Sequence, residues 1–128
     1  MPHLTVYAVE DDLAGREPHL IAGLTEAVVA VYGEWARDVA VVLLVGLPPG
    51  RFGIGGKPAA APAPFVQFGI REAVFARPDA ADIVTRLIAG VTDAIVAVLG
   101  ERVRPGLTVE FTGTPDGRTG VGGALATH

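Results

Sequence analysis

The residue with the clearest chemical potential in this chain is Pro2. A starting methionine followed by a small residue is normally removed, which would leave Pro2 with a free secondary amine. An α-amino group has a lower pKa than a lysine side chain, and burial in an apolar pocket or nearby arginines would lower that pKa further. Such a nitrogen could act as a general base at neutral pH, or attack a carbonyl carbon to form an iminium ion.

Four arginines are candidates for holding an acidic substrate, because a planar guanidinium group can bind a carboxylate through two parallel hydrogen bonds. Arg71 ends a predicted strand that should pair beside the first strand, so it could approach Pro2, and Arg77 follows soon after. Arg51 and Arg118 occupy equal places in two glycine-rich loops. That repetition suggests a structural pair as readily as a functional one.

Composition excludes several other classes of function. The net charge of −4 argues against a nucleic-acid binder, and the absence of cysteine removes disulfides, thiolate nucleophiles and cysteine-based metal sites. The three histidines lack the spacing of a metal site, and no GxGxxG or P-loop motif implies a nucleotide cofactor. The N-terminus does not resemble a signal peptide, and the longest apolar run, residues 39–47, is far too short to span a membrane. We therefore expect a cytoplasmic protein with no metal and no cofactor.

The chain contains an internal duplication. Residues 20–34 (LIAGLTEAVVAVYGE) and 87–101 (LIAGVTDAIVAVLGE) are identical at 11 of 15 positions, and the differences are conservative except for Tyr32 against Leu99. Such self-similarity indicates two copies of one supersecondary unit. We interpret Tyr32 and Trp35 as packing residues.

Each copy reads as strand, helix, strand, a βαβ unit with a right-handed crossover. Helical spacing of apolar residues, extended apolar runs and glycine-rich stretches define the elements. The predicted strands are residues 4–9, 39–45, 65–71 and 107–112, and the predicted helices are 17–32 and 79–99, with Asp79 as a candidate N-cap. Loops follow at 46–56 and 113–123, a proline-stiffened linker lies at 57–63, and the tail 124–128 is expected to fray.

These units predict one domain over residues 1–128, made of repeats 2–56 and 64–123. Its fold class is α/β (α+β), a four-stranded sheet with both helices on one face. The other face is apolar on this pattern and needs a cover, which three sheets around an axis would provide. We therefore expect a homotrimer.

The order of these features resembles the tautomerase superfamily. Met-Pro runs directly into a strand, then a helix, a strand and the sequence GRFGIGG, a pattern similar to that of 4-oxalocrotonate tautomerase. The resemblance implies that Pro2 is catalytic, that Phe52 lines the pocket and keeps the proline nitrogen dry, and that fused chains of this length form trimers. In the second copy Pro64 is locked in an amide and Thr119 replaces the phenylalanine.

Two departures from the family pattern concern substrate binding. The positions that correspond to the family's carboxylate-binding arginines hold Asp12 and Ala40 here. Residues 65–72 (FVQFGIRE) resemble the corresponding segment of cis-3-chloroacrylic acid dehalogenase, another fused member, and Arg71 falls on one of its substrate-binding arginines. The second such position holds Val74, with Arg77 close by.

The leading hypothesis is a cofactor-independent tautomerase, an isomerase in which Pro2 moves a proton on a small 2-hydroxydienoate or arylenolpyruvate. A hydratase, decarboxylase or dehalogenase of small unsaturated or β-keto acids is the alternative. Gly120 and Val121 occupy the region of the dehalogenase's water-activating carboxylate, which counts against hydrolysis. A third hypothesis is a binding member of the superfamily without catalytic activity.

Overall fold

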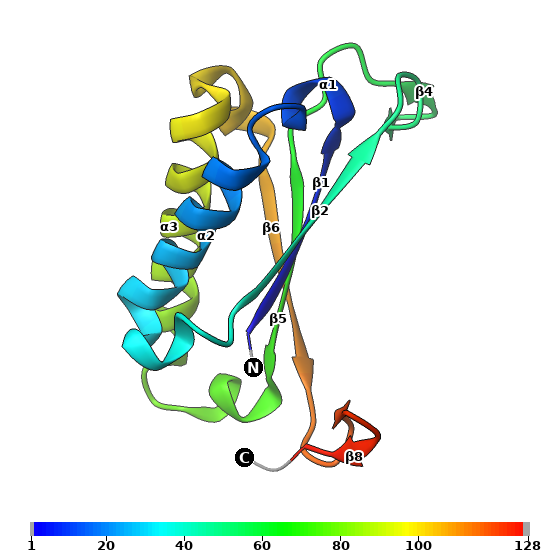
Figure 1. Cartoon of the computed structure of the whole chain (residues 1–128). Coiled ribbons are helices and arrows are strands. Elements are labelled where there is room, and N and C mark those ends of the chain that lie inside the picture. Colours follow the sequence, from blue (N-terminus) through cyan, green and yellow to red (C-terminus); the bar gives the residue numbers. More distant parts are fainter. Residues whose placement is uncertain (1, 127–128) are drawn as a thin grey trace.

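The computed structural model describes residues 2–126 and contains a four-stranded sheet with two long helices packed on it (Figure 1). The sheet strands are β1 (His3–Val9), β2 (Val41–Leu47), β5 (Phe65–Arg71) and β6 (Thr108–Thr114). The α-helices are α1 (Glu10–Leu13), α2 (Glu17–Tyr32) and α3 (Ala80–Leu99), and the 3-10 helices are η1 (Glu34–Ala36), η2 (Glu72–Ala76) and η3 (Glu101–Gly106). Two short hairpins complete the fold, β3 (Gly53–Ile54) with β4 (Lys57–Pro58) and β7 (Gly120–Val121) with β8 (Ala124–Leu125).

The strand order β2-β1-β5-β6 places the first strands of the two repeats side by side at the centre of the sheet. Strands are parallel within each repeat, β1 with β2 and β5 with β6, whereas β1 and β5 are antiparallel. In that register His3 lies opposite Gly69, so the beginning of β1 adjoins the end of β5. The predicted fold class is confirmed, and its topology brings Pro2 to the end of the strand that carries Arg71.

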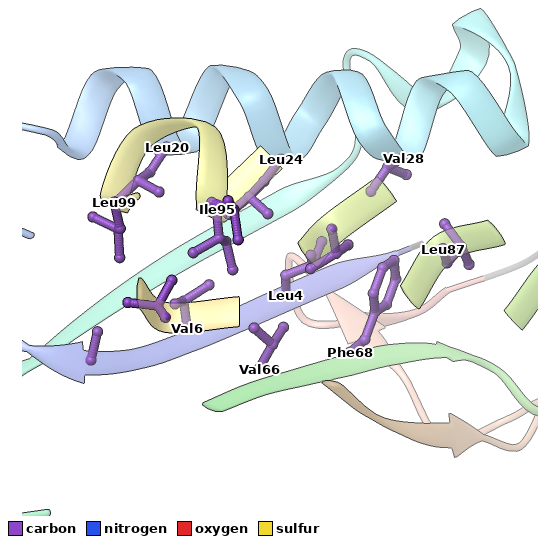
Figure 2. Packing of buried hydrophobic residues seen from close by; sticks show 14 of the residues in the cluster. Leu4, Val6, Leu20, Leu24, Val28, Val66, Phe68, Leu87, Ile95 and Leu99 are labelled. Atoms are coloured by element: carbon purple, nitrogen blue, oxygen red, sulfur yellow. The ribbon is translucent and has the colours of Figure 1, made fainter. Parts of the chain in front are cut away.

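The core lies between one face of the sheet and the helices α2 and α3 (Figure 2). Alternate residues of the central strands point into it, because successive side chains of a strand face opposite ways. The helices contribute residues at three- and four-residue spacing, as an apolar helix face requires. Its fully buried members include Leu4, Val6, Val66 and Phe68 from the strands and Leu20, Leu24, Val28, Leu87 and Ile95 from the helices.

The opposite face of the sheet carries no helix (Figure 1). On β2 it presents three exposed apolar side chains, Val41, Leu43 and Val45, of which Leu43 is 53% exposed. On β6 the equivalent outward positions are Thr108 and Glu110, followed by Thr112. The expectation of an apolar outer face is therefore correct for the β2 edge and wrong for the β6 edge.

Several predicted boundaries are corrected. Strand β2 begins at Val41, two residues later than predicted, because the backbone N–H groups of Val39 and Ala40 donate to the Ala36 carbonyl in the turn that ends η1. Residues 57–58 form a strand in place of linker. Residues 124–125, predicted to fray, pair with β7, and the Ala126 N–H donates to the Thr119 carbonyl at 2.7 Å. The remaining tail residues 127–128 lie outside the described residues.

One ion-pair motif occurs in both repeats. Arg37 contacts Glu26 on α2 and Glu34 on η1, with Nε to Glu34 Oε2 at 2.8 Å. Arg104 repeats this with Asp93 at 2.9 Å and Glu101 at 2.8 Å. Each arginine thereby ties the helix to the 3-10 turn that leads into the next strand.

No helix within residues 2–126 is both long and apolar enough to cross a membrane.

Candidate active site

A cavity of about 300 Å³ opens where β1 begins and β5 ends, and Pro2 lies in its wall. The first repeat contributes Pro2 and the end of α2, and the second repeat contributes the end of β5 and the start of α3. Antiparallel pairing of β1 and β5 is what joins these four pieces of chain. The polar side chains that line the cavity are Tyr32, Trp35, Arg71, Arg77, Asp79 and Arg86, and its apolar lining includes Val31, Ile70, Val74 and Ile83.

Pro2 itself is buried, as are Leu4 beyond it and Ile70 on the neighbouring strand. Its carbonyl oxygen accepts a hydrogen bond from the Val41 N–H at 3.0 Å, which continues the parallel ladder between β1 and β2. The proline is thus held by backbone pairing at the first position of the sheet, with its ring in the cavity wall.

Arg71 reaches the cavity from the last position of β5. Its Nη2 atom donates to Asp116 Oδ1 at 3.4 Å, a long contact that brings in the loop after β6. Its Nε atom is buried and has no hydrogen-bond partner among residues 2–126. A buried guanidinium N–H without an acceptor is costly, so this atom is suited to receive an oxygen of a ligand.

Arg77 and Asp79 form a bidentate pair in the wall of the same cavity, with Nε to Oδ1 at 2.9 Å and Nη2 to Oδ2 at 3.0 Å. These hydrogen bonds lower the pKa of Asp79 and raise that of Arg77. Asp79 stands at the N-cap of α3, as predicted, but its side chain makes no capping hydrogen bond because Arg77 takes both of its oxygens. The pair leaves a carboxylate that is poorly basic.

Tyr32 and Trp35 form an aromatic corner of the cavity. Their ring centroids are 5.8 Å apart at an interplanar angle of 55°, and the indole Nε1 donates to the Tyr32 carbonyl at 2.8 Å. The Tyr32 hydroxyl is buried and has no hydrogen-bond partner in the described part of the chain. Burial raises the pKa of Tyr32, and the positive charge of Arg77 opposes that shift only in part. The phenol is therefore neutral at physiological pH and can donate a hydrogen bond.

Comparison with known proteins places this arrangement in a family. The model of the family described as "Tautomerase enzyme" matches residues 2–61. A fused 4-OT (4-oxalocrotonate tautomerase), R7, described as an asymmetric trimer, is 30% identical with a TM-score of 0.79, over 96% of this chain and 94% of that one. The chain belongs to the tautomerase superfamily.

Other solved members agree with this assignment. A second fused 4-OT, F6, also described as an asymmetric trimer, has 29% identity and a TM-score of 0.80, with 96% of this chain and 94% of that chain covered. A member of the cis-3-chloroacrylic acid dehalogenase family shares the fold at 17% identity, with a TM-score of 0.71 over 98% of this chain and 83% of that one. No curated protein matches the sequence significantly.

Within this tautomerase-superfamily fold, the predicted site residues separate into two groups. Arg71 and Arg77 lie in the wall of the Pro2 cavity, whereas Arg51, Phe52 and Arg118 do not. Phe52 lies at the opposite end of the sheet, because the loop that carries it follows β2, which runs parallel to β1 and away from Pro2. Within a single chain, then, Phe52 cannot keep the Pro2 nitrogen dry.

The opposite end of the sheet holds the pseudo-equivalent region around Pro64. Phe52 and Arg102 line a cavity there together with Pro64. Arg102 donates to Asp12 Oδ1 at 2.6 Å. The cation at this end is therefore neutralised by a nearby carboxylate, and its proline nitrogen is an amide.

Tyr32, Trp35 and Arg86 line the Pro2 cavity although the sequence analysis did not select them as site residues. A signal for Tyr32 was present: it is the single non-conservative difference in the 15-residue duplication, where the second repeat has Leu99. Trp35 likewise corresponds to Arg102, by the same offset of 67. Departures from internal symmetry thus mark the cavity that contains the potential amine.

Proposed function

We propose that this chain is a cofactor-independent tautomerase that converts the enol of a small 2-oxo acid, such as a 2-hydroxydienoate or an arylenolpyruvate, to its keto form. The observation that carries the proposal is the position of Pro2 in one cavity with Arg71, whose buried Nε lacks an acceptor. Because the chain belongs to the tautomerase superfamily, we interpret the Pro2 amine as the group that moves the proton and the Arg71 guanidinium as the group that binds the acid.

In the proposed reaction, the amine freed by removal of Met1 accepts the proton of the enol hydroxyl. The oxygen's electrons then form the C2 carbonyl. The electron pair of the enol carbon–carbon double bond, relayed through the second double bond in a dienoate, forms a C–H bond with the proton that the proline nitrogen returns. An amine at a buried position, in a cavity wall that also holds the guanidinium group of Arg71, is suited to act as the general base, because burial and nearby positive charge disfavour the charged form of an amine.

Arg71 is the proposed anchor of the substrate carboxylate. Arg71 lines the cavity, its buried Nε has no acceptor within residues 2–126, and its long contact to Asp116 leaves Nη2 able to exchange partners. Guanidinium also stabilises the negative charge that develops on the enolate, since a fixed cation in a partly dry site costs no reorganisation.

Hydration and hydrolytic dehalogenation would need a carboxylate that activates water, and the cavity supports this role less well than proton transfer by Pro2. Among the described lining residues of the cavity, Asp79 is the one carboxylate, and both of its oxygens accept hydrogen bonds from Arg77. A general base needs a pKa near the working pH, whereas the hydrogen bonds from Arg77 lower the pKa of Asp79. This observation favours isomerisation over hydration or hydrolytic dehalogenation.

We further propose that the active form is a homotrimer. The relatives with solved structures include fused 4-OT proteins described as trimers. The exposed apolar side chains of β2 offer a surface for such packing, because burial of apolar area drives association.

The test is to follow ketonisation of phenylenolpyruvate by ultraviolet absorbance with protein whose mass establishes that Met1 has been removed. We expect turnover that is lost when an added N-terminal residue converts the Pro2 nitrogen to an amide. Equal turnover by the extended chain would refute the proposal.

A further inference from the structure

The Tyr32 hydroxyl belongs to a residue that lines the cavity, and the proposed mechanism leaves it unused. Tyr32 lines the cavity that also has Pro2 in its wall, and its hydroxyl oxygen is buried and has no hydrogen-bond partner within residues 2–126. A buried hydroxyl without a partner carries a desolvation cost, and such groups call for an explanation. A ligand oxygen in the cavity would supply the missing acceptor.

The ring of Tyr32 is held in place by its neighbours. The Trp35 ring packs against the Tyr32 ring, with 5.8 Å between the ring centroids. The indole N–H of Trp35 also donates to the backbone carbonyl of Tyr32 at 2.8 Å, which holds the Tyr32 backbone in place. Val31 and Ile83 contribute apolar surface to the same wall. The hydroxyl is therefore preorganised, a requirement for a donor that acts on charge developing in a transition state.

The duplication provides an internal comparison. At the position equivalent to Tyr32 the second repeat has Leu99, which is buried and only 8% exposed. A side chain without a polar group thus satisfies the packing needs of this position in the same fold. The hydroxyl occurs only in the repeat whose proline can become a free amine, which connects it with the chemistry of that end.

We propose that Tyr32 is a further catalytic residue of the Pro2 site: its hydroxyl donates a hydrogen bond to the 2-oxygen of the substrate, while Arg71 holds the carboxylate. This inference rests on the proposed function. Tyr32 transfers no proton in this role. Pro2 takes the proton from the 2-hydroxyl and returns it to carbon, and Tyr32 stabilises the oxygen while it carries the enolate charge. Because burial raises the pKa of Tyr32, the donor persists through the neutral pH range.

Kinetics of Tyr32→Phe are the first measurement, since this change removes only the hydroxyl and keeps the ring against Trp35. We expect kcat for phenylenolpyruvate to fall by about 100-fold, the effect of losing one donor to an oxyanion, with little change in KM. Tyr7→Phe is the matched control. The Tyr7 hydroxyl donates a 3.4 Å hydrogen bond to Gln67 Oε1, and Tyr7 does not line the cavity. Removal of this hydroxyl should therefore leave kcat unchanged.

Ligand binding gives a second measurement that does not depend on turnover. Trp35 is the only tryptophan of the chain and lines the cavity, so its fluorescence can report binding of 2-hydroxyhexanoate and of hexanoate. Neither acid can form an iminium ion with Pro2. The wild-type protein should prefer the 2-hydroxy acid by about tenfold, the contribution of one hydrogen bond, and Tyr32→Phe should abolish that preference. Arg71→Ala should weaken both acids alike.

An unchanged kcat in Tyr32→Phe overturns the inference while leaving the proposed function intact, and so does a retained preference for the 2-hydroxy acid. Thermal melting of both tyrosine variants establishes that a lost rate is not lost folding. If the wild-type chain has no ketonisation activity, the proposed function fails instead. The binding preference then decides by itself whether Tyr32 contacts the 2-oxygen.

Discussion

Pro2 and Pro64 make the same backbone hydrogen bond at opposite ends of the sheet. The Pro2 carbonyl accepts from the Val41 N–H at 3.0 Å, and the Pro64 carbonyl accepts from the Thr108 N–H at 3.2 Å. Each therefore begins the parallel strand pair of its own repeat. The two prolines are structural equivalents, and removal of Met1 would give only one of them a basic nitrogen.

This equivalence yields a matched pair of variants. Pro2→Ala keeps an amine at the N-terminus but makes it primary and more mobile, so kcat/KM for phenylenolpyruvate should fall by at least about 10–100-fold, the scale of a general base. Pro64→Ala should leave the chemistry almost intact because its nitrogen is an amide. Initial rates measured side by side check this, and equal effects of the two changes would remove Pro2 from the mechanism.

Arg71 should govern the affinity for acidic substrates. Arg71→Ala should raise KM and cost about 1.5–3 kcal/mol in kcat/KM, as for a hydrogen bond to a charged group. Arg71→Lys should recover only part of this, since an ammonium group cannot bind a carboxylate in bidentate fashion.

The matched control is Arg16→Ala, because Arg16 donates to the Asp12 carbonyl and does not line the Pro2 cavity. Steady-state kinetics of the three variants provide the measurement. If Arg71→Ala stays within a factor of two of the wild type for a carboxylate substrate, the anchor is another residue, with Arg77 and Arg86 next in line.

Assembly depends on the outer face of β2 in our proposal. Leu43→Glu should dissociate the trimer, because a carboxylate placed in an apolar interface loses its hydration without gaining a partner. Ile21→Glu introduces the same charge at an exposed position of α2 and should leave assembly unchanged. Light scattering distinguishes a trimer of about 40 kDa from the 13.2 kDa chain. A trimer that persists in Leu43→Glu would place the interface elsewhere.

The repeated arginine motif predicts a pH-dependent contribution to stability. Hydrogen bonds from Arg37 lower the pKa of Glu26 and of Glu34 below the usual 4.5. A carboxyl group with a lowered folded-state pKa stabilises the fold above its unfolded pKa and loses that effect as pH falls through the folded value. Arg37→Ala should therefore lower Tm at pH 7, and the difference from wild type should shrink below pH 4.5.

Arg104→Ala is the internal replicate, because Arg104 lowers the pKa of Glu101 in the same way. Circular dichroism melts at pH 7 and pH 3 measure both variants. A Tm difference that is the same at both pH values would mean that these arginines stabilise the protein through packing of their stems rather than through their charge.

The sequence by itself was sufficient for the four strands of the sheet, the two long helices and the fold class. Apolar spacing at 3.6 residues located α2 at its observed bounds, and the continuous apolar runs gave four strands within two residues of their positions. These features depend on near neighbours in the chain, and the duplication doubled the signal. The β3–β4 and β7–β8 hairpins were missed, because each strand has two residues and too short a pattern to recognise.

The tertiary structure decided which residues share a cavity. Tyr32 comes from the end of α2 and Arg77 from the segment before α3, and they meet at Pro2 because β1 and β5 pair antiparallel. Within one chain, the same pairing sends Phe52 to the other end of the sheet from Pro2. Strand direction between repeats is set by how both helices pack on one shared face. That long-range packing leaves no periodic trace in the sequence, so the partners of Pro2 had to be found in space.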